Sequence, residues 1–202
     1  SSAASDVYKR QDNASGVAGL LELARLLQQQ TPGIGVQLVA YASEEPPFFR
    51  SDEMGSAVHA ASLERPVKLM IALEMIGYYD STPGSQDYPS PAMSWLYPDR
   101  GDFIAVVGRM QDINAVRQVK AALLSSRDLS VYSMNAPGFI PGVDFSDHLN
   151  YWQHDIPAVM ITDTAFYRNK QYHLPGDIAD RLNYQKMAQV VDGVTTLLYN
   201  SK

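Results

Sequence analysis

Residues 36–45, with the sequence VQLVAYASEE, restrict the possible folds of this chain more than any other stretch. Their apolar part, residues 36–41, lies between prolines and glycines, which is typical of a short buried strand. Two adjacent carboxylates, Glu44 and Glu45, follow it, and neighbouring side chains of an extended segment point in opposite directions. We therefore expect one glutamate to bind a metal ion and the other to act as a general base. The alternative is a solvated acidic strand end.

The composition narrows the kinds of site that the chain can hold. With 202 residues, 46% of them hydrophobic and 19% charged, the chain suits one globular domain. A net charge of -6 argues against a nucleic-acid partner, and no apolar run is long enough for a membrane segment. Cysteine is absent, so a metal site has to use carboxylates and histidines. The four histidines are His59, His148, His154 and His173.

Apolar strand patterns alternate with helical patterns along the chain. Helices are predicted at residues 15–30, 52–62, 113–124 and 184–198. Strands are predicted at residues 36–41, 67–75, 103–107, 129–133 and 158–161. This alternation predicts an α/β fold, with a mostly parallel mixed sheet flanked by helices.

The acidic and histidine candidates follow predicted strands, where open α/β sheets bind their ligands. Glu74 stands near the end of the second strand, the loop with His173 follows the last one, and Asp12 precedes the first helix. Taken singly, Asp12 could be a helix cap and Glu74 an exposed residue at a strand end. Together, such ligands suit zinc, with an adjacent carboxylate that accepts a proton from water.

Several motifs, in this order, resemble the M28 family of zinc aminopeptidases: DNASG, SEE, LEMIG, SDH and YHLPGD. The resemblance covers nearly all of residues 12–202, and EEPPFFRSDEMGS and TDTAFYRN resemble a bacterial branch of the family. It implies the zinc-dependent exopeptidase fold, which is phosphorylase/hydrolase-like. It also implies hydrolysis of peptides at a free N-terminus.

The resemblance also implies a role for each candidate ligand. Asp12 would bridge two zinc ions, and Glu45 and His173 would complete the first zinc site. Glu74 would bind the second zinc, where many family members have aspartate. Glu44 would be the general base and later the general acid.

The family has a further histidine ligand in an H-x-D motif upstream of the Asp-Asn motif. This histidine is missing from the present sequence. Residues 1–11, SSAASDVYKRQ, instead resemble a translated sequencing adapter. We therefore expect an N-terminally truncated chain, in which residues 12–202 form one partial peptidase domain that lacks its first strands. The second zinc site would be incomplete and the activity impaired. Export to the periplasm or outside is compatible with the family, but its signal would lie upstream.

Five further residues are candidates for orienting ligands or lining the substrate pocket. Asp147 and His148 either support the metal ligands or have a structural role. Tyr167 and Arg168 either line the pocket, where the arginine would meet a substrate carboxylate, or lie exposed on a loop. Asp177 is a candidate acceptor for the second ring proton of the zinc-binding histidine.

Two other functions fit the same residues. A glutaminyl cyclase-like enzyme would use a single zinc bound by Asp12, Glu45 and His173. A non-catalytic binding module on the same fold would have lost Glu44 or its ligands, whereas Glu44 and these three ligands are present here.

Overall fold

The structure is a computed structural model that describes residues 12–201, so the predicted adapter-like segment lies outside the described residues. The longer helices are α1 (Ala14–Leu27), α3 (Ile113–Leu123) and α5 (Tyr184–Asn200), and the shorter ones are α2 (Gly55–Ala61) and α4 (His148–Trp152). The strands are β1 (Met70–Glu74), β2 (Ile104–Gly108), β3 (Val131–Asn135) and β4 (Ala158–Thr162). Among these residues, no helix is long and apolar enough to cross a membrane.

The four strands form one mixed sheet in the order β1-β4-β2-β3. β1 is parallel to β4, with Glu74 opposite Thr162, and β2 is parallel to β3. The central pair, β2 and β4, is antiparallel. The predicted α/β architecture with a mostly parallel mixed sheet is therefore confirmed.

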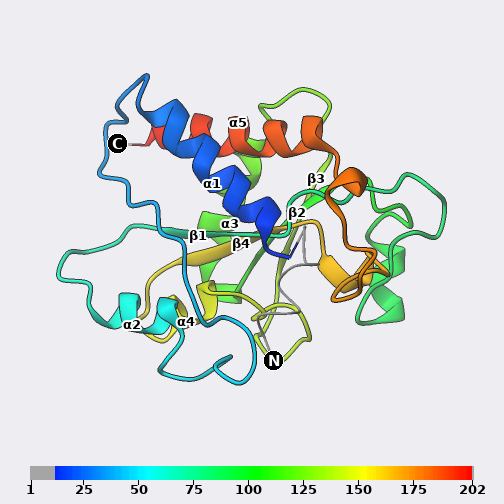
Figure 1. Cartoon of the computed structure of the whole chain (residues 1–202), viewed down its shortest axis with the longest axis horizontal. Coiled ribbons are helices and arrows are strands. Elements are labelled where there is room, and N and C mark those ends of the chain that lie inside the picture. The colour runs from blue at the N-terminus through cyan, green and yellow to red at the C-terminus, as the bar shows by residue number, and fades with distance from the viewer. Residues whose placement is uncertain (1–11, 202) are drawn as a thin grey trace.

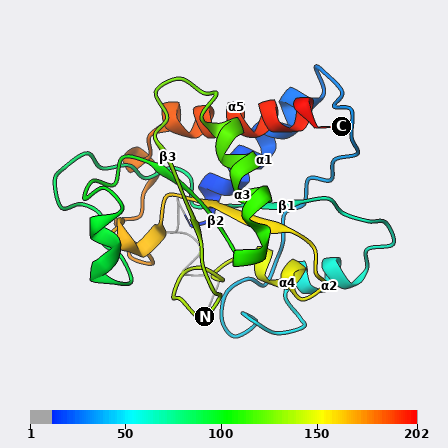
Figure 2. The ribbon, with the colours of Figure 1, turned by 180° about the vertical axis from the view of Figure 1, so that it is seen from behind.

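Three helices cover one face of the sheet. Figure 1 shows α1 and α5 side by side along the sheet, and Figure 2 shows α3 from behind, where it packs on α5 and β2. The side chains of β2 alternate between the two faces of the sheet. Ile104 and Val106 join the core under the helices, whereas Ala105 and Val107 belong to a second apolar cluster.

The predicted strand at residues 36–41 is wrong as a strand. In the part of the chain that the structure describes, the sheet ends at β1, and residues 36–41 are not paired with it. Leu38 and Tyr41 still pack against apolar clusters, so the side chains make the contacts that the pattern indicates. A strand also needs a neighbouring strand that accepts its backbone hydrogen bonds.

The bounds of other elements also differ from the prediction: β1 and α2 each begin three residues later, at Met70 and Gly55. α4 lies in a region for which no helix was predicted. Figure 1 shows α2 and α4 beside each other, at the opposite end of the sheet from β3.

Candidate metal centre

Asp12, Glu45 and His173 meet at one point, although up to 161 residues separate them along the chain. One ligand atom from each lies within 4.8 Å of the others. His173 Nε2 lies 2.7 Å from Asp12 Oδ2 and 3.5 Å from Glu45 Oε1. Two carboxylates and one imidazole, at separations that a single ion can bridge, are a donor set that fits zinc.

Asn13 ties the turn that contains Asp12 to the end of β1. Its Oδ1 accepts hydrogen bonds from Gly16 N at 3.1 Å and Met75 N at 3.0 Å. Its Nδ2 donates to Leu73 O at 2.9 Å. This residue therefore caps α1 and fixes Asp12 relative to the strand that ends in Glu74. In the sequence, Asn13 appeared as part of the DNASG motif.

Asp177 supports Asp12 from the other side. Its buried carboxylate accepts hydrogen bonds from Asp12 N at 3.4 Å and from Asn169 Nδ2 at 2.9 Å. These contacts give Asp177 a positioning role beside the centre. Its predicted contact with the ring of His173 stays a prediction.

His173 lies in the long loop after β4, with a left-handed backbone at φ +58°. Its ring stacks on Tyr172, with 3.9 Å between the ring centres and 19° between the planes. Burial raises the pKa of the Tyr172 hydroxyl, and the nearby negative charges of Asp12 and Glu45 raise it further. Tyr172 is therefore a neutral phenol beside the ligands. Its adjacency to His173 was the signal that sequence reasoning did not use.

Glu74 is buried at the end of β1, and the charges of nearby carboxylates at the same centre act on its carboxyl group. Ser146 Oγ donates to its Oε2 at 2.7 Å, and Asn13 Nδ2 lies 3.3 Å from the same oxygen. Burial raises the pKa of Glu74 well above its usual value, and the charges of Glu44 and Asp12 raise it further. Such a concentration of buried carboxylates is stabilised by a bound cation. A divalent metal ion therefore fits the site.

Glu74 does not belong to the group of three that the described residues form around His173. Its place as a ligand of a second zinc stays a prediction. Ser146, which was read only as part of the SDH motif, is the residue that orients its carboxylate.

Glu44 precedes the ligand Glu45 and follows Ser43, whose backbone is left-handed at φ +62°. Of the charged neighbours, Glu44 has the largest effect on the pKa of Glu74. The carboxylate of Glu44 therefore lies close enough to Glu74 to act on it electrostatically. The role of Glu44 as a general base stays a prediction.

An apolar pocket opens beside the centre and crosses the sheet face opposite α1, α3 and α5. It encloses about 100 Å³. Glu74, Tyr167 and Tyr172 belong to its wall, and that this pocket binds the substrate stays a prediction. The rest of the wall comes from the long loop before β2, from inward-facing residues of β2, β3 and β4, and from residues 141–145. Representative lining residues are Tyr88, Met93, Tyr97, Ala105, Tyr132 and Met160.

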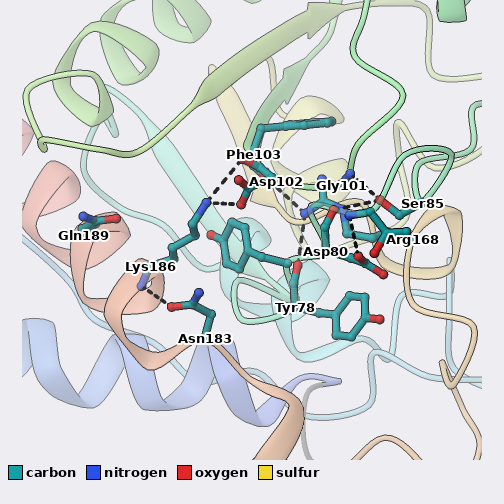
Figure 3. Close-up of polar contacts among 12 residues, drawn as sticks. Tyr78, Asp80, Ser85, Gly101, Asp102, Phe103, Arg168, Asn183, Lys186 and Gln189 are labelled. Carbon is teal, nitrogen blue, oxygen red and sulfur yellow. Dashed lines mark hydrogen bonds and ion pairs between the residues drawn. The ribbon is translucent and has the colours of Figure 1, made fainter.

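Arg168 lies neither in the pocket wall nor exposed on a loop, which were the two predicted positions. It is 2% exposed and does not line the pocket, because its guanidinium is held inside the protein. It donates to the carbonyls of Tyr78 at 3.0 Å and Phe103 at 2.9 Å and to Gln86 Oε1 at 2.9 Å. Figure 3 shows Arg168 beside Gly101, where a Cβ would lie 2.5 Å from its Nε. Arg168 therefore anchors the long loop that forms one pocket wall.

His148 is fully buried and lies edge-on to Trp152. Its Nε2 donates to Val143 O at 2.8 Å, and burial lowers its pKa to about 4. Asp147 directly precedes α4, and burial raises the pKa of its carboxyl. The contacts of His148 agree with a structural role, and a role of either residue as a support for the ligands stays a prediction.

Comparison with known proteins identifies the family of the chain. The model of peptidase family M28 matches residues 10–198. A protein of Escherichia coli K12, described as "Uncharacterized protein YfbL", is 93% identical over 191 residues. Those residues are 95% of this chain and 59% of that protein, so the chain spans three fifths of the relative's length.

Solved structures share the fold. The zinc aminopeptidase BSAP from Bacillus subtilis has a TM-score of 0.66 at 20% identity, over 94% of this chain and 41% of that one. A glutaminyl cyclase from Bacteroides thetaiotaomicron has a TM-score of 0.65 at 20% identity, over 95% of this chain and 63% of that one. With its α/β fold, its Asp-Glu-His group and the match over residues 10–198, this chain belongs to peptidase family M28.

Proposed function

We propose that the chain carries a zinc-dependent aminopeptidase site that hydrolyses the first peptide bond of peptides with a free N-terminus. The observation that supports this most is the group of Asp12, Glu45 and His173, with Glu44 beside it and an apolar pocket adjoining it. The family and the fold of the zinc aminopeptidase from Bacillus subtilis agree with it.

In the proposed reaction, these residues have different roles. Asp12, Glu45 and His173 would hold the ion, and zinc bound there would supply Lewis-acid activation of water at neutral pH. Glu44 accepts a proton from the attacking water and then donates it to the leaving amine. The neutral phenol of Tyr172 donates a hydrogen bond to the carbonyl oxygen as negative charge develops there.

The pocket sets the substrate preference. Its wall combines tyrosine, phenylalanine and methionine side chains, which favour a large apolar side chain on the first residue of the substrate. The substrate's amino group would then lie near Glu74, at the carboxylate-rich end of the pocket. A second zinc at Glu74 and Asp12 also belongs to this proposal.

The test is turnover of leucine p-nitroanilide, with acetyl-leucine p-nitroanilide as the blocked control. We expect the 202-residue chain to cleave the first compound slowly and the second not at all. A chelator should abolish cleavage, and added zinc should restore it. The full-length Escherichia coli relative, assayed in parallel, is expected to be faster. Absence of cleavage by both proteins would refute the proposal.

A second function is supported by the same group of three. Glutaminyl cyclisation by a single-zinc enzyme needs no second ion, and a glutaminyl cyclase shares the fold. Incubation with glutaminyl-phenylalanine amide separates the two reactions. Cyclisation releases ammonia and leaves the peptide bond intact, whereas the aminopeptidase releases phenylalanine amide. The apolar wall of the pocket favours release of phenylalanine amide.

A further inference from the structure

A row of aromatic rings leads away from the metal centre across the surface. From the ring of His173 it passes to Tyr172 at 3.9 Å and to Phe166 after another 5.6 Å. Phe145 follows at 6.2 Å, and the guanidinium carbon of Arg50 lies 5.7 Å from the centre of that ring. Phe145 also lines the apolar pocket. The row therefore joins the pocket rim to a positive charge.

Arg50 is held in place but remains open to solvent. Its guanidinium lies over the rings of Phe49 and Phe145, and these two rings meet edge to face. It also forms an ion pair with Asp144 through Nη2. The arginine side chain is 52% exposed, against 18% for Asp144. Because a guanidinium has five N–H donors in a planar fork, this contact leaves donors for a second carboxylate.

The position of Arg50 suits the far end of a short peptide. If the first side chain fills the pocket, the rest of the peptide has to leave over the surface beside the centre. The four steps from His173 to Arg50 add up to 21.4 Å along the row. An extended peptide spans at most roughly 3.5 Å per residue, so about six residues cover the whole row. The carboxylates of the centre repel the C-terminus of such a peptide, whereas Arg50 attracts it.

On the basis of the proposed function, we propose that Arg50 binds the C-terminal carboxylate of short peptide substrates. The aromatic row of Phe145 and Phe166 lies under the residues in between. The site thereby prefers oligopeptides of about six residues with a free C-terminus over long chains.

Binding to the metal-free chain tests this without turnover. We would titrate the hexapeptide leucyl-tetraglycyl-phenylalanine and its C-terminal amide by calorimetry. The free acid is expected to bind about fivefold more tightly, which is the range of an exposed ion pair. The variant Arg50→Gln should lose this preference, and Arg50→Lys should keep part of it because the charge remains. Arg65→Gln, at an exposed position in a different loop, is the matched control and should keep it.

Two results would overturn the inference. One is equal binding of acid and amide by the unmodified chain, and the other is an undiminished preference in Arg50→Gln. Leucine p-nitroanilide has no carboxylate. Its turnover therefore tests the aminopeptidase proposal separately from the role of Arg50.

Discussion

At the scale of single residues, the adjacent side chains of Glu44 and Glu45 make different contacts. Glu45 reaches His173 at 3.5 Å, whereas Glu44 acts on the carboxylate of Glu74. The sequence predicted a metal ligand and a general base from the geometry of an extended segment alone, and these two roles stay predictions. It did not predict that the supporting contacts come from Asn13 and Ser146, because hydrogen bonds to a distant strand leave no local pattern.

Replacing Glu44 by glutamine removes the proton acceptor and keeps the size of the side chain. We expect turnover of leucine p-nitroanilide to fall by roughly 10²- to 10⁴-fold, the usual contribution of a general base. Zinc binding should change little, because the three ligands remain. Glu64→Gln, in an exposed loop, is the control and should retain full activity. Undiminished turnover in Glu44→Gln would show that another group accepts the proton.

The buried imidazole of His148 gives the stability a measurable pH dependence. Burial lowers its pKa in the folded state to about 4 from an ordinary value of 6.5, so the unfolded chain binds more protons between these values. The stabilisation that depends on the neutral ring is complete above pH 6.5 and is lost as the pH falls towards 4. The loss amounts to roughly 3 kcal/mol in the free energy of unfolding.

Chemical denaturation at a series of pH values checks this expectation. Between pH 7 and pH 4, the native chain should lose more stability than His148→Gln. His154→Gln changes an exposed histidine and should behave like the native chain. Identical slopes for the native chain and His148→Gln would contradict the assignment.

At the scale of elements, the periodicity of apolar residues predicted most helices and strands. It succeeded because each of these elements packs its apolar side chains on the core. The helix at residues 113–124 and the strand at 158–161 agree with α3 and β4 to within one residue. Residues 36–41 have the same kind of apolar pattern but no strand beside them in the described sheet. Pairing depends on a distant segment, so a local pattern cannot establish it.

The close approach of α1 to β1 depends on Gly16. A Cβ at this position would lie 2.2 Å from Leu73 O and 2.5 Å from Asn13 Oδ1. Gly16→Ala should therefore push the start of the helix, and Asp12 with it, away from the strand. We expect a loss of about 1–3 kcal/mol in the free energy of unfolding and weaker zinc binding.

Thermal unfolding and a zinc titration measure both effects. Gly35→Ala is the matched control, because a Cβ at Gly35 meets nothing within 4 Å. Equal stability and equal zinc affinity in Gly16→Ala and Gly35→Ala would contradict the close approach described here.

At the scale of the whole molecule, one face of the sheet is closed by helices and the other is open to a pocket. Ala105 on β2 is a small residue in the pocket wall, so a larger side chain there should fill the cavity. Ala105→Phe is expected to lower kcat/KM for phenylalanyl substrates by roughly tenfold more than for alanyl ones. Ala121→Phe, exposed on α3, should leave this ratio unchanged. An unchanged ratio in Ala105→Phe would place the first side chain elsewhere.

The central claim is that Asp12, Glu45 and His173 together hold a metal ion, and zinc content tests it most directly. The chain would be loaded with zinc, dialysed and analysed by mass spectrometry, together with His173→Ala and the exposed control His154→Ala. We expect at least one zinc per chain in the native protein and in His154→Ala, and loss of that zinc in His173→Ala. A native chain without zinc, or a His173→Ala variant that retains as much, would contradict the account.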